Sequence, residues 1–417
     1  MQSTTTSEPM QHPATVYVWV WLPDADEAVV AGRLDDHGSG AVTFTYGRSY
    51  LANPDAIALY LPDLPLRSGE IAPTSGTLPG CIADAAPDAW GRRVIEYRLR
   101  ASDTDLSELA YLLESGSDRA GALDFQASAT EYTPRSGEGA DLGQLAEAAQ
   151  RVEDGQPLPP ALERALLDGT SIGGARPKVA LRDQRTGVIA KFTSSRDTYP
   201  VVKAEYIAME LARRAGIDTA RVEFAAAAGR DVLLVRRFDR SPPRKRRMMI
   251  SALTILDLHD AHGIAGRYAT YAALADSIRA RFGSPDATLR ELFSRIVFNI
   301  FVSNTDDHAK NHSAFWNGRE LTLTPAYDIC PQQRTGGEAH QAMAYGPNGE
   351  RLSQAARCAE HAHIYHLDSH EAQAIIDSHI DTITEHWQDV CDAAQLSQAD
   401  RERLWGRQFL NPFALHP

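Results

Sequence analysis

The first part of the chain alternates apolar and polar positions in short runs, a pattern that predicts strands. One β-rich run spans Val16 to Leu22, a turn is expected at Gly32, and threonines alternate with apolar residues from Ala41 to Tyr46. A further apolar strand is expected over Ile57 to Leu61. These runs predict a small α+β domain in this part of the chain.

One helix should follow these strands and begin in the segment Pro87 to Arg93. Asp88 stands near its N-cap, where an Asp side chain can accept a hydrogen bond from a backbone N–H of the first turn. Trp90, Val94 and Tyr97 recur at helical spacing, so they share one side of this helix.

Later in the chain the pattern changes from strands to helices. Val179–Leu181 and Gly187–Phe192 are typical of a hairpin, a helix should span Val202 to Ala215, and Asp231–Val235 should be a buried strand. From about Ser251 onward the pattern is helical, with an apolar stripe at Leu292, Ile296, Val297, Ile300 and Phe301. A strand-rich small lobe, one embedded helix and a larger helical lobe is the order of parts in a two-lobed kinase, although fold order alone does not establish function.

Glycine, serine and glutamate dominate the segment Ser136 to Gly139, which predicts a linker and a boundary near residue 140. The expected division is a disordered tail (1–14), an N-terminal subdomain (15–135), a linker (136–145), a small lobe (146–240) and a helical large lobe (241–417).

The composition is that of an ordinary globular protein without a membrane span. Hydrophobic residues make up 43% and charged residues 23% of the 417 positions, and no window reaches the ~18 apolar residues that cross a bilayer. The first residues lack the basic start and the apolar core of a signal peptide, so we expect a cytoplasmic protein. The cysteines Cys81, Cys330, Cys358 and Cys391 are far apart, which fits reduced thiols better than disulfides or zinc ligands.

The formal net charge of −13 argues against a surface devoted to nucleic acid, because phosphate contacts need clustered Lys and Arg. One basic cluster, between Arg236 and Arg247, is the exception. It is most simply a solvated loop, and contact with an anionic partner is the alternative.

The segment Ser171 to Lys178 places Gly173 and Gly174 directly before a strand. Glycines let backbone N–H groups approach phosphate oxygens, and Arg176 and Lys178 add positive charge. The spacing from glycine to lysine does not fit a P-loop, and neither Ser nor Thr follows the lysine. A plain Gly-Gly turn is an equally good interpretation of this segment alone.

Lys191 lies inside an apolar strand, where an unpaired ammonium group would be costly to remove from water. Glu205 follows on the predicted helix and could pair with it, as a strand Lys and a helix Glu do in kinases while the Lys touches nucleotide phosphates. A solvent-facing Lys at a sheet edge is the alternative.

The segment Arg236 to Phe238 follows the predicted buried strand and would lie at the hinge between the two lobes. Its backbone could bind an adenine ring, with Phe238 as an apolar wall. The alternative is a plain strand end.

The segment Ser303 to His312 packs acids, amides and bases into ten residues after an apolar helix. Asp306 and Asn311 have the spacing that kinases use for the residue that deprotonates a hydroxyl and the residue that holds Mg²⁺. Lys310 or His308 could balance phosphate charge. The alternative is that Asp306 only caps a helix and Asn311 only forms a turn.

A predicted strand from Leu321 onward ends at Asp328, which is suited to be the second Mg²⁺ ligand. His308 and His312 stand four residues apart, but a zinc motif of this spacing needs Glu after the first His, and Ala309 stands there. We therefore expect magnesium chemistry in this region and not zinc.

Together, Ser171–Lys178, Asn304–Asn311 and Thr324–Asp328 closely resemble the HipA family, the kinase toxins of bacterial HipBA-type toxin–antitoxin modules. The three motifs occur in family order, and residues 16–125, with Trp90–Arg93 and Gly121–Leu123, look like the family's N-terminal subdomain. The resemblance covers most of the chain. It implies an α+β protein-kinase-like fold with a β-rich N-terminal lobe, an added N-terminal subdomain and an all-helical C-terminal lobe.

The resemblance also implies an ATP- and Mg²⁺-dependent serine/threonine protein kinase. Asp306 would be the catalytic base, Asn311 and Asp328 the metal ligands, and Glu205 the ion-pair partner of Lys191. The implied nucleotide contacts are Gly173, Gly174, Ala175, Arg176, Pro177, Lys178, Lys191, Arg236, Arg237, Phe238, His308, Ala309, Lys310, Asn311, Tyr327 and Asp328.

Family members can autophosphorylate a serine of the glycine-rich loop, which by position is Ser171. A phosphate there would add about two negative charges beside the ATP phosphates and so favour self-inactivation. The implied partners are a protein substrate and a helix-turn-helix antitoxin similar to HipB, with DNA contacted mainly through the antitoxin. A catalytically silent scaffold or co-repressor is the main alternative, and a metal hydrolase, active without ATP, is a third.

Overall fold

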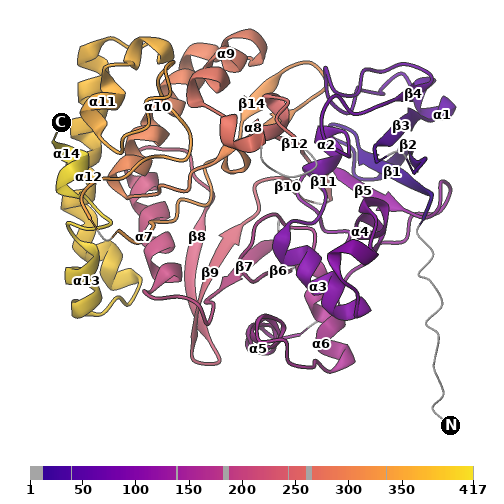
Figure 1. Ribbon diagram of the computed structural model, residues 1–417, viewed down its shortest axis with the longest axis horizontal. Helices are drawn as coiled ribbons and strands as arrows, with labels where there is room; N and C mark the ends of the chain where they lie inside the picture. The colour runs from indigo at the N-terminus through magenta and orange to yellow at the C-terminus, as the bar shows by residue number, and fades with distance from the viewer. Residues whose placement is uncertain are drawn as a thin grey trace.

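The computed structural model describes residues 13–38, 40–137, 140–181, 187–242, 244–259, 265–334 and 336–416. Most of the predicted tail and Glu138–Gly139 of the predicted linker lie outside these ranges. No helix in the described ranges combines the length and the apolar character needed to cross a membrane. Figure 1 shows an N-terminal subdomain, a central sheet and a helical lobe side by side.

The N-terminal subdomain is built on an antiparallel sheet with strand order β4-β3-β2-β1-β5. Its strands are β1 (Thr15–Trp21), β2 (Ala28–Asp36), β3 (Val42–Tyr46), β4 (Glu70–Ile71) and β5 (Leu123–Gln126). Its helices are α1 (Arg48–Leu51), α2 (Gly80–Ala83), α3 (Ala89–Leu99), the short 3₁₀ helix η1 (Asp103–Asp105) and α4 (Glu108–Glu114). The strands expected near Val16 and Ala41 are confirmed.

Two expectations for this subdomain are wrong. Gly32 is not a turn but lies inside β2, opposite Val18 and next to a register shift in β1. A side chain at Gly32 would collide with Phe44 and Thr45 on β3, so the glycine serves close strand packing. The segment Ile57 to Leu61 is apolar yet forms no strand. Its backbone pairs only in an isolated β-bridge between Tyr60 and Leu64, as far as the described residues show.

The small lobe contains a four-stranded antiparallel sheet in the order β6-β7-β9-β8. Its strands are β6 (Lys178–Leu181), β7 (Val188–Phe192), β8 (Val222–Ala227) and β9 (Arg230–Arg236), which confirms the hairpin and the buried strand. Its helices are α5 (Leu142–Glu153), α6 (Pro160–Ala165), the 3₁₀ helix η2 (Leu166–Gly169) and α7 (Val201–Arg214). The amphipathic α7 packs on β9 on one side and on the large lobe on the other.

The large lobe is mainly helical. It comprises α8 (Ala252–Ile255), α9 (Tyr271–Arg281), α10 (Pro285–Phe301), α11 (Ala355–Ala359), α12 (Ser369–Ala393), α13 (Gln398–Leu404) and α14 (Pro412–Leu415), with 3₁₀ helices η3 (Ala265–Tyr268), η4 (Ala309–Asn311) and η5 (Ala362–Tyr365). The apolar stripe of α10 is confirmed, because all five of its residues are fully buried.

The expectation of an all-helical lobe needs one correction. A three-stranded sheet, β12 (Met248–Ser251), β13 (Ser313–Trp316) and β14 (Leu321–Leu323), lies beside the cavity described below. Strand β14 ends at Leu323, so Asp328 lies in the following loop and does not end the strand as expected. The strand expected from Leu321 onward is confirmed as β14, whereas β12 and β13 were not expected, because four residues give little periodicity.

The basic cluster between Arg236 and Arg247 is only partly a solvated loop, because Arg244 and Arg247 are exposed while Arg237 and Arg240 are largely buried in ion pairs. Arg237 is 2% exposed and pairs with Asp239 at 2.7 Å and with Asp118 of the N-terminal subdomain at 2.9 Å. Arg240, the first residue of the small strand β10 (Arg240–Ser241), pairs with the same two carboxylates, and β10 lies beside β11 (Lys245–Arg246). Buried charges require such partners, so the cluster joins the N-terminal subdomain to the small lobe.

Candidate active site

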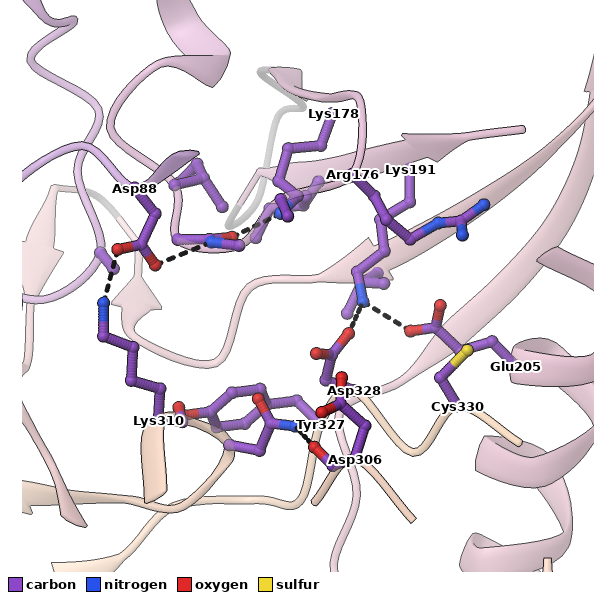
Figure 2. Close-up of a pocket in the computed structure, with 18 of the residues that line it drawn as sticks. Asp88, Arg176, Lys178, Lys191, Glu205, Asp306, Lys310, Tyr327, Asp328 and Cys330 are labelled. Atoms are coloured by element: carbon purple, nitrogen blue, oxygen red, sulfur yellow. Dashed lines mark hydrogen bonds and ion pairs between the residues drawn. The ribbon is translucent and has the colours of Figure 1, made fainter. Parts of the chain in front are cut away.

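A cavity of about 670 Å³ opens where the three parts of the chain meet. Its walls come from the N-terminal subdomain around Asp84 and Asp88, from the glycine-rich loop, from the end of β9 and from the loop that contains Asp306. A cavity of this size with convergent charged groups is typical of a small-molecule site. Figure 2 shows some of the side chains that line it.

Lys191 lies at the centre of an ion-pair network. Strand β7 is flanked by β6 and β9, so Lys191 is not at a sheet edge, and its side chain is 13% exposed. Its Nζ donates to Glu205 of α7 at 2.5 Å and also to Asp328 (Figure 2). Burial lowers the pKa of the Lys191 ammonium, but these two carboxylates outweigh it and raise the pKa, so Lys191 stays charged.

Asp328 is held by the same network. Its backbone is left-handed, with φ of 60°, a conformation that is strained for a residue other than glycine. Burial opposes its ionisation, yet Lys191 lowers the pKa of Asp328 to about 2. The carboxylate is therefore ionised and lines the cavity, where it could bind a cation.

The glycine-rich loop, which is the segment from Ser171 to Lys178, lies over the cavity. Lys178 is buried at the start of β6 and donates to the carbonyl of Gly173 at 2.5 Å. Arg176 instead pairs with Asp197 at 2.6 Å, so its guanidinium is engaged before any ligand binds. Gly174 has a φ of 106°, which favours glycine and turns the loop toward the cavity.

The N-terminal subdomain contacts this loop directly. Asp88 accepts a hydrogen bond from the Gly174 N–H at 2.9 Å and pairs with Lys310 Nζ at 2.5 Å (Figure 2). Trp90 donates through its backbone N–H to the Gly174 carbonyl and through Nε1 to the Lys178 carbonyl at 2.9 Å. Sequence reasoning recognised Asp88 only as a helix cap, since no local pattern indicates a partner 86 residues away.

The loop from Ser303 to His312 is anchored by Asp307. Its buried carboxylate accepts from Asn299 Nδ2 at 2.7 Å and from the Tyr271 hydroxyl, and it lies 2.8 Å from His312 Nε2. His312 is thus a structural partner of Asp307. Burial opposes ionisation, but His312 outweighs it and keeps the pKa of Asp307 low. The role of Asp307 was not predicted from the sequence, although an Asp followed by a His five residues later could have indicated a pair within the loop.

Asp306, next in sequence to this anchor, is exposed at the cavity. Partial desolvation raises the pKa of its carboxyl, the carboxylates of Asp328 and Asp307 raise it further, and His308 counteracts them. A carboxylate with a raised pKa is a better proton acceptor than an ordinary one. Asn311 Nδ2 donates a long, weak hydrogen bond of 3.5 Å to the backbone carbonyl of Asp306, which lies in the same short loop.

The end of β9 forms the opposite wall of the cavity. Phe238 packs against Tyr327 and Phe315 with ring centroids 5.7 and 6.0 Å apart, which makes the expected apolar wall. Arg237 uses its side chain in the buried ion cluster, and Arg236 pairs with Glu223 at 2.8 Å. Both side chains are thus engaged in ion pairs, and the main-chain contact with a nucleotide stays a prediction.

The structure brings most of the predicted site residues to one cavity. Gly173–Arg176, Lys178, Lys191, Glu205, Arg236–Phe238, Asp306, His308, Lys310, Asn311, Tyr327 and Asp328 all line it. Pro177, Ala309 and Ser171 are buried beside it and do not line it. Their roles, like those of the lining residues, stay predictions.

The oxygen donors at one end of the cavity fit a magnesium ion. Asp328 offers a carboxylate and Asn311 an amide carbonyl, and Mg²⁺ needs only one or two such ligands beside phosphates and water. The described residues contain no group of three or more His, Cys, Asp and Glu side chains placed to hold a metal ion alone. A metal here would depend on a ligand's phosphates.

Two curated kinases are similar to this chain at low identity. The putative kinase Y4mE of Sinorhizobium fredii is 26% identical over 72% of this chain and 74% of its own length. The serine/threonine-protein kinase toxin HipA of Shewanella oneidensis is also 26% identical, over 44% of this chain and 48% of its own length.

A solved structure extends the similarity to the whole fold. HipA in the complex of HipA, HipB and operator DNA from Shewanella oneidensis MR-1 superimposes with a TM-score of 0.62 at 20% identity, over 93% of this chain and 97% of that one. Identity at this level establishes the fold alone.

Family models identify both parts of the chain. The HipA N-terminal domain matches residues 20–126, and the HipA-like C-terminal domain matches residues 170–387, which is more than half of the chain. With its mixed α+β fold and its cavity between lobes, the protein belongs to the HipA family.

Proposed function

We propose that this protein is an ATP- and Mg²⁺-dependent serine/threonine protein kinase that phosphorylates another protein. The observation that carries the proposal is the meeting of Asp306 with the Lys191–Glu205–Asp328 network in one cavity. The names of the two curated relatives support it, because both are called kinases.

The chemistry follows from the positions of these groups. Lys191, oriented by Glu205, and the backbone N–H groups of the glycine-rich loop would hold the ATP phosphates. Asn311 and Asp328 would hold Mg²⁺, which neutralises phosphate charge when bound. Asp306 would accept the proton of a Ser or Thr hydroxyl whose oxygen bonds to the γ-phosphorus, while the bond from that phosphorus to ADP breaks.

Phosphate transfer from [γ-³²P]ATP tests the proposal. We expect wild type to label itself or an added protein extract, and Asp306→Asn to lose labelling by about 10² to 10⁴-fold while still binding ATP. Asp381→Asn, which removes a carboxylate from the exposed face of α12, should retain wild-type activity. Equal labelling by wild type and Asp306→Asn would defeat the proposal and leave a silent scaffold as the better interpretation.

We also propose that Ser171 is an autophosphorylation site. Its side chain is 1% exposed, and its hydroxyl has no hydrogen-bond partner among the described residues. The loop must therefore move before this hydroxyl can receive phosphate, and an unpartnered buried hydroxyl makes that movement less costly. If Ser171→Ala leaves both phosphate incorporation and the decay of activity over time unchanged, this proposal fails.

A helix-turn-helix antitoxin is the proposed partner. The structural neighbour was solved with HipB and operator DNA, and the net charge of −13 fits DNA contact through a partner. Affinity capture from the host followed by mass spectrometry should recover a small basic DNA-binding protein. Recovery of protein substrates alone would contradict the antitoxin proposal.

A further inference from the structure

Asp88 is an N-terminal-subdomain residue whose carboxylate reaches into the proposed ATP site. It occupies the N-cap position of α3, where an Asp side chain ordinarily accepts a hydrogen bond from its own helix. Within the described residues its carboxylate makes no such bond. One oxygen accepts from the Gly174 N–H at 2.9 Å, and the other pairs with Lys310 at 2.5 Å (Figure 2).

The two groups that Asp88 holds are the kind that bind phosphate. Gly174 presents a backbone N–H from the glycine-rich loop, and Lys310 presents an ammonium group from the loop between Ser303 and His312. Both residues line the cavity. A carboxylate that joins such a pair imitates two oxygens of a phosphate group, in charge and in hydrogen-bond acceptance.

The charge on Asp88 is maintained by its surroundings. Burial opposes ionisation, but Lys310, the Gly174 N–H and Lys178 outweigh it and keep the pKa of Asp88 below its usual value. The carboxylate is therefore ionised at neutral pH. A terminal phosphate that approached Gly174 and Lys310 would meet this negative charge.

We propose that Asp88 is an internal phosphate mimic, which occupies the position of the terminal phosphate of ATP and must be displaced before the nucleotide binds fully. The inference rests on the proposed function, because it assumes that the cavity binds ATP. It gives the N-terminal subdomain a direct influence on nucleotide affinity. The bonds from Trp90 to Gly174 and Lys178 keep the loop beside α3 after Asp88 moves away.

The test compares nucleotide affinities by calorimetry with the full chain. We expect Asp88→Asn to bind ATP about tenfold more tightly than wild type, since it removes a like charge from the phosphate position. The affinity for adenosine, which has no phosphate, should not change. Asp88→Ser, which can cap α3, should show the same selective gain and serves if the Asn variant folds poorly.

Asp103→Asn is the matched control, because it removes the same charge from an exposed part of the same subdomain. It should bind both ligands as wild type does. Unchanged or weaker ATP binding by both Asp88 variants would overturn the inference, as would an equal gain for adenosine or an equal gain in Asp103→Asn. If neither wild type nor any variant binds ATP, the proposed function falls as well, which separates the two failures.

Discussion

Lys178 illustrates how a single side chain in this cavity depends on its neighbours. It is buried, it donates to Gly173, and it lies near the positive charge of Lys191. Burial and then Lys191 lower the pKa of Lys178 to about 8, although nearby carboxylates raise it in part. Unlike an exposed lysine, it can lose its proton slightly above neutral pH.

This pKa predicts a pH dependence of ATP binding. Below about pH 8 Lys178 is charged and attracts phosphate, and above that value the neutral amine does not, so the affinity for ATP should fall as pH rises. Calorimetric titrations between about pH 6.5 and 9.5 should show the loss. Lys178→Arg should remove it, because arginine stays charged throughout. A wild-type affinity without any alkaline loss would contradict the prediction.

A second prediction at the scale of single residues concerns Asp307. Asp307→Asn would weaken the contacts to Asn299, Tyr271 and His312 that hold the loop from Ser303 to His312. We expect the free energy of unfolding to fall by about 3 kcal/mol, as when one partner of a buried pair is lost. We also expect kcat to fall more than the affinity for ATP. Urea unfolding and steady-state kinetics measure both, and a stability within error of wild type would contradict the anchor role.

At the residue scale, the sequence was most informative where function requires a short, specific spacing. Asp306 and Asn311 were predicted from their spacing within one loop, and Lys191 from its place in an apolar strand; all three line the cavity, and their roles stay predictions. Asp88 and Asp84 line the same cavity but come from a distant segment. Their part in it depends on how the N-terminal subdomain packs, which no local pattern encodes.

At the scale of elements, α3 sets the position of the glycine-rich loop. Gly91 on this helix packs so closely on the segment after η2 that a side chain there would overlap the Thr170 carbonyl. The same helix carries Asp88 and Trp90, which bond to the loop. The contact between α3 and the loop therefore depends on a residue without a side chain.

Gly91→Ala should separate α3 from the loop. Overpacking of this kind costs about 1–3 kcal/mol of stability, and here it should also weaken ATP binding because Gly174 and Lys178 are displaced. Thermal melts and calorimetry check the two effects. Gly155→Ala is a matched control, since open space surrounds that position, and its left-handed φ should affect only stability. A Gly91→Ala protein with normal ATP affinity would exclude this positioning role.

The stripe of α10 was predicted because it is long and periodic, whereas short strands were predicted unevenly. Strands β6 and β7 have only four and five residues, but their mostly apolar sequences were enough to predict the hairpin. Strand β14 was expected from Leu321 onward, but β13, a strand of four residues in a mainly helical lobe, was not. The apolar run from Ile57 to Leu61 is partly buried without strand neighbours, which shows that burial alone does not make a strand.

For the whole molecule, the buried cluster of Arg237, Arg240, Asp118 and Asp239 joins the N-terminal subdomain to the small lobe. Asp239 also accepts from the Gly121 N–H at 2.8 Å, and the two arginines lower its pKa against the effect of burial. In sequence this cluster looked like a surface charge run, because its acidic partners come partly from a distant segment.

Asp239→Asn tests this junction. Two buried guanidinium groups would lose a charged partner, so we expect a loss of about 3–5 kcal/mol and earlier proteolysis between the subdomain and the small lobe. Differential scanning calorimetry and limited trypsin digestion follow these changes. Asp36→Asn, at the end of β2 away from the cluster, should leave both unchanged. A wild-type melting profile for Asp239→Asn would show that the cluster does not hold the parts together.

The wall of the cavity that comes from the N-terminal subdomain has a consequence for inhibitor design. In the proposed ATP site, the carboxylates of Asp84 and Asp88 come from the N-terminal subdomain, and a kinase without such a subdomain has no counterpart of this wall. A compound that fills the adenine end and extends a cationic group toward these two acids would gain affinity here and lose it elsewhere. The junction between subdomain and lobes thus provides a basis for inhibitor selectivity in the proposed ATP site.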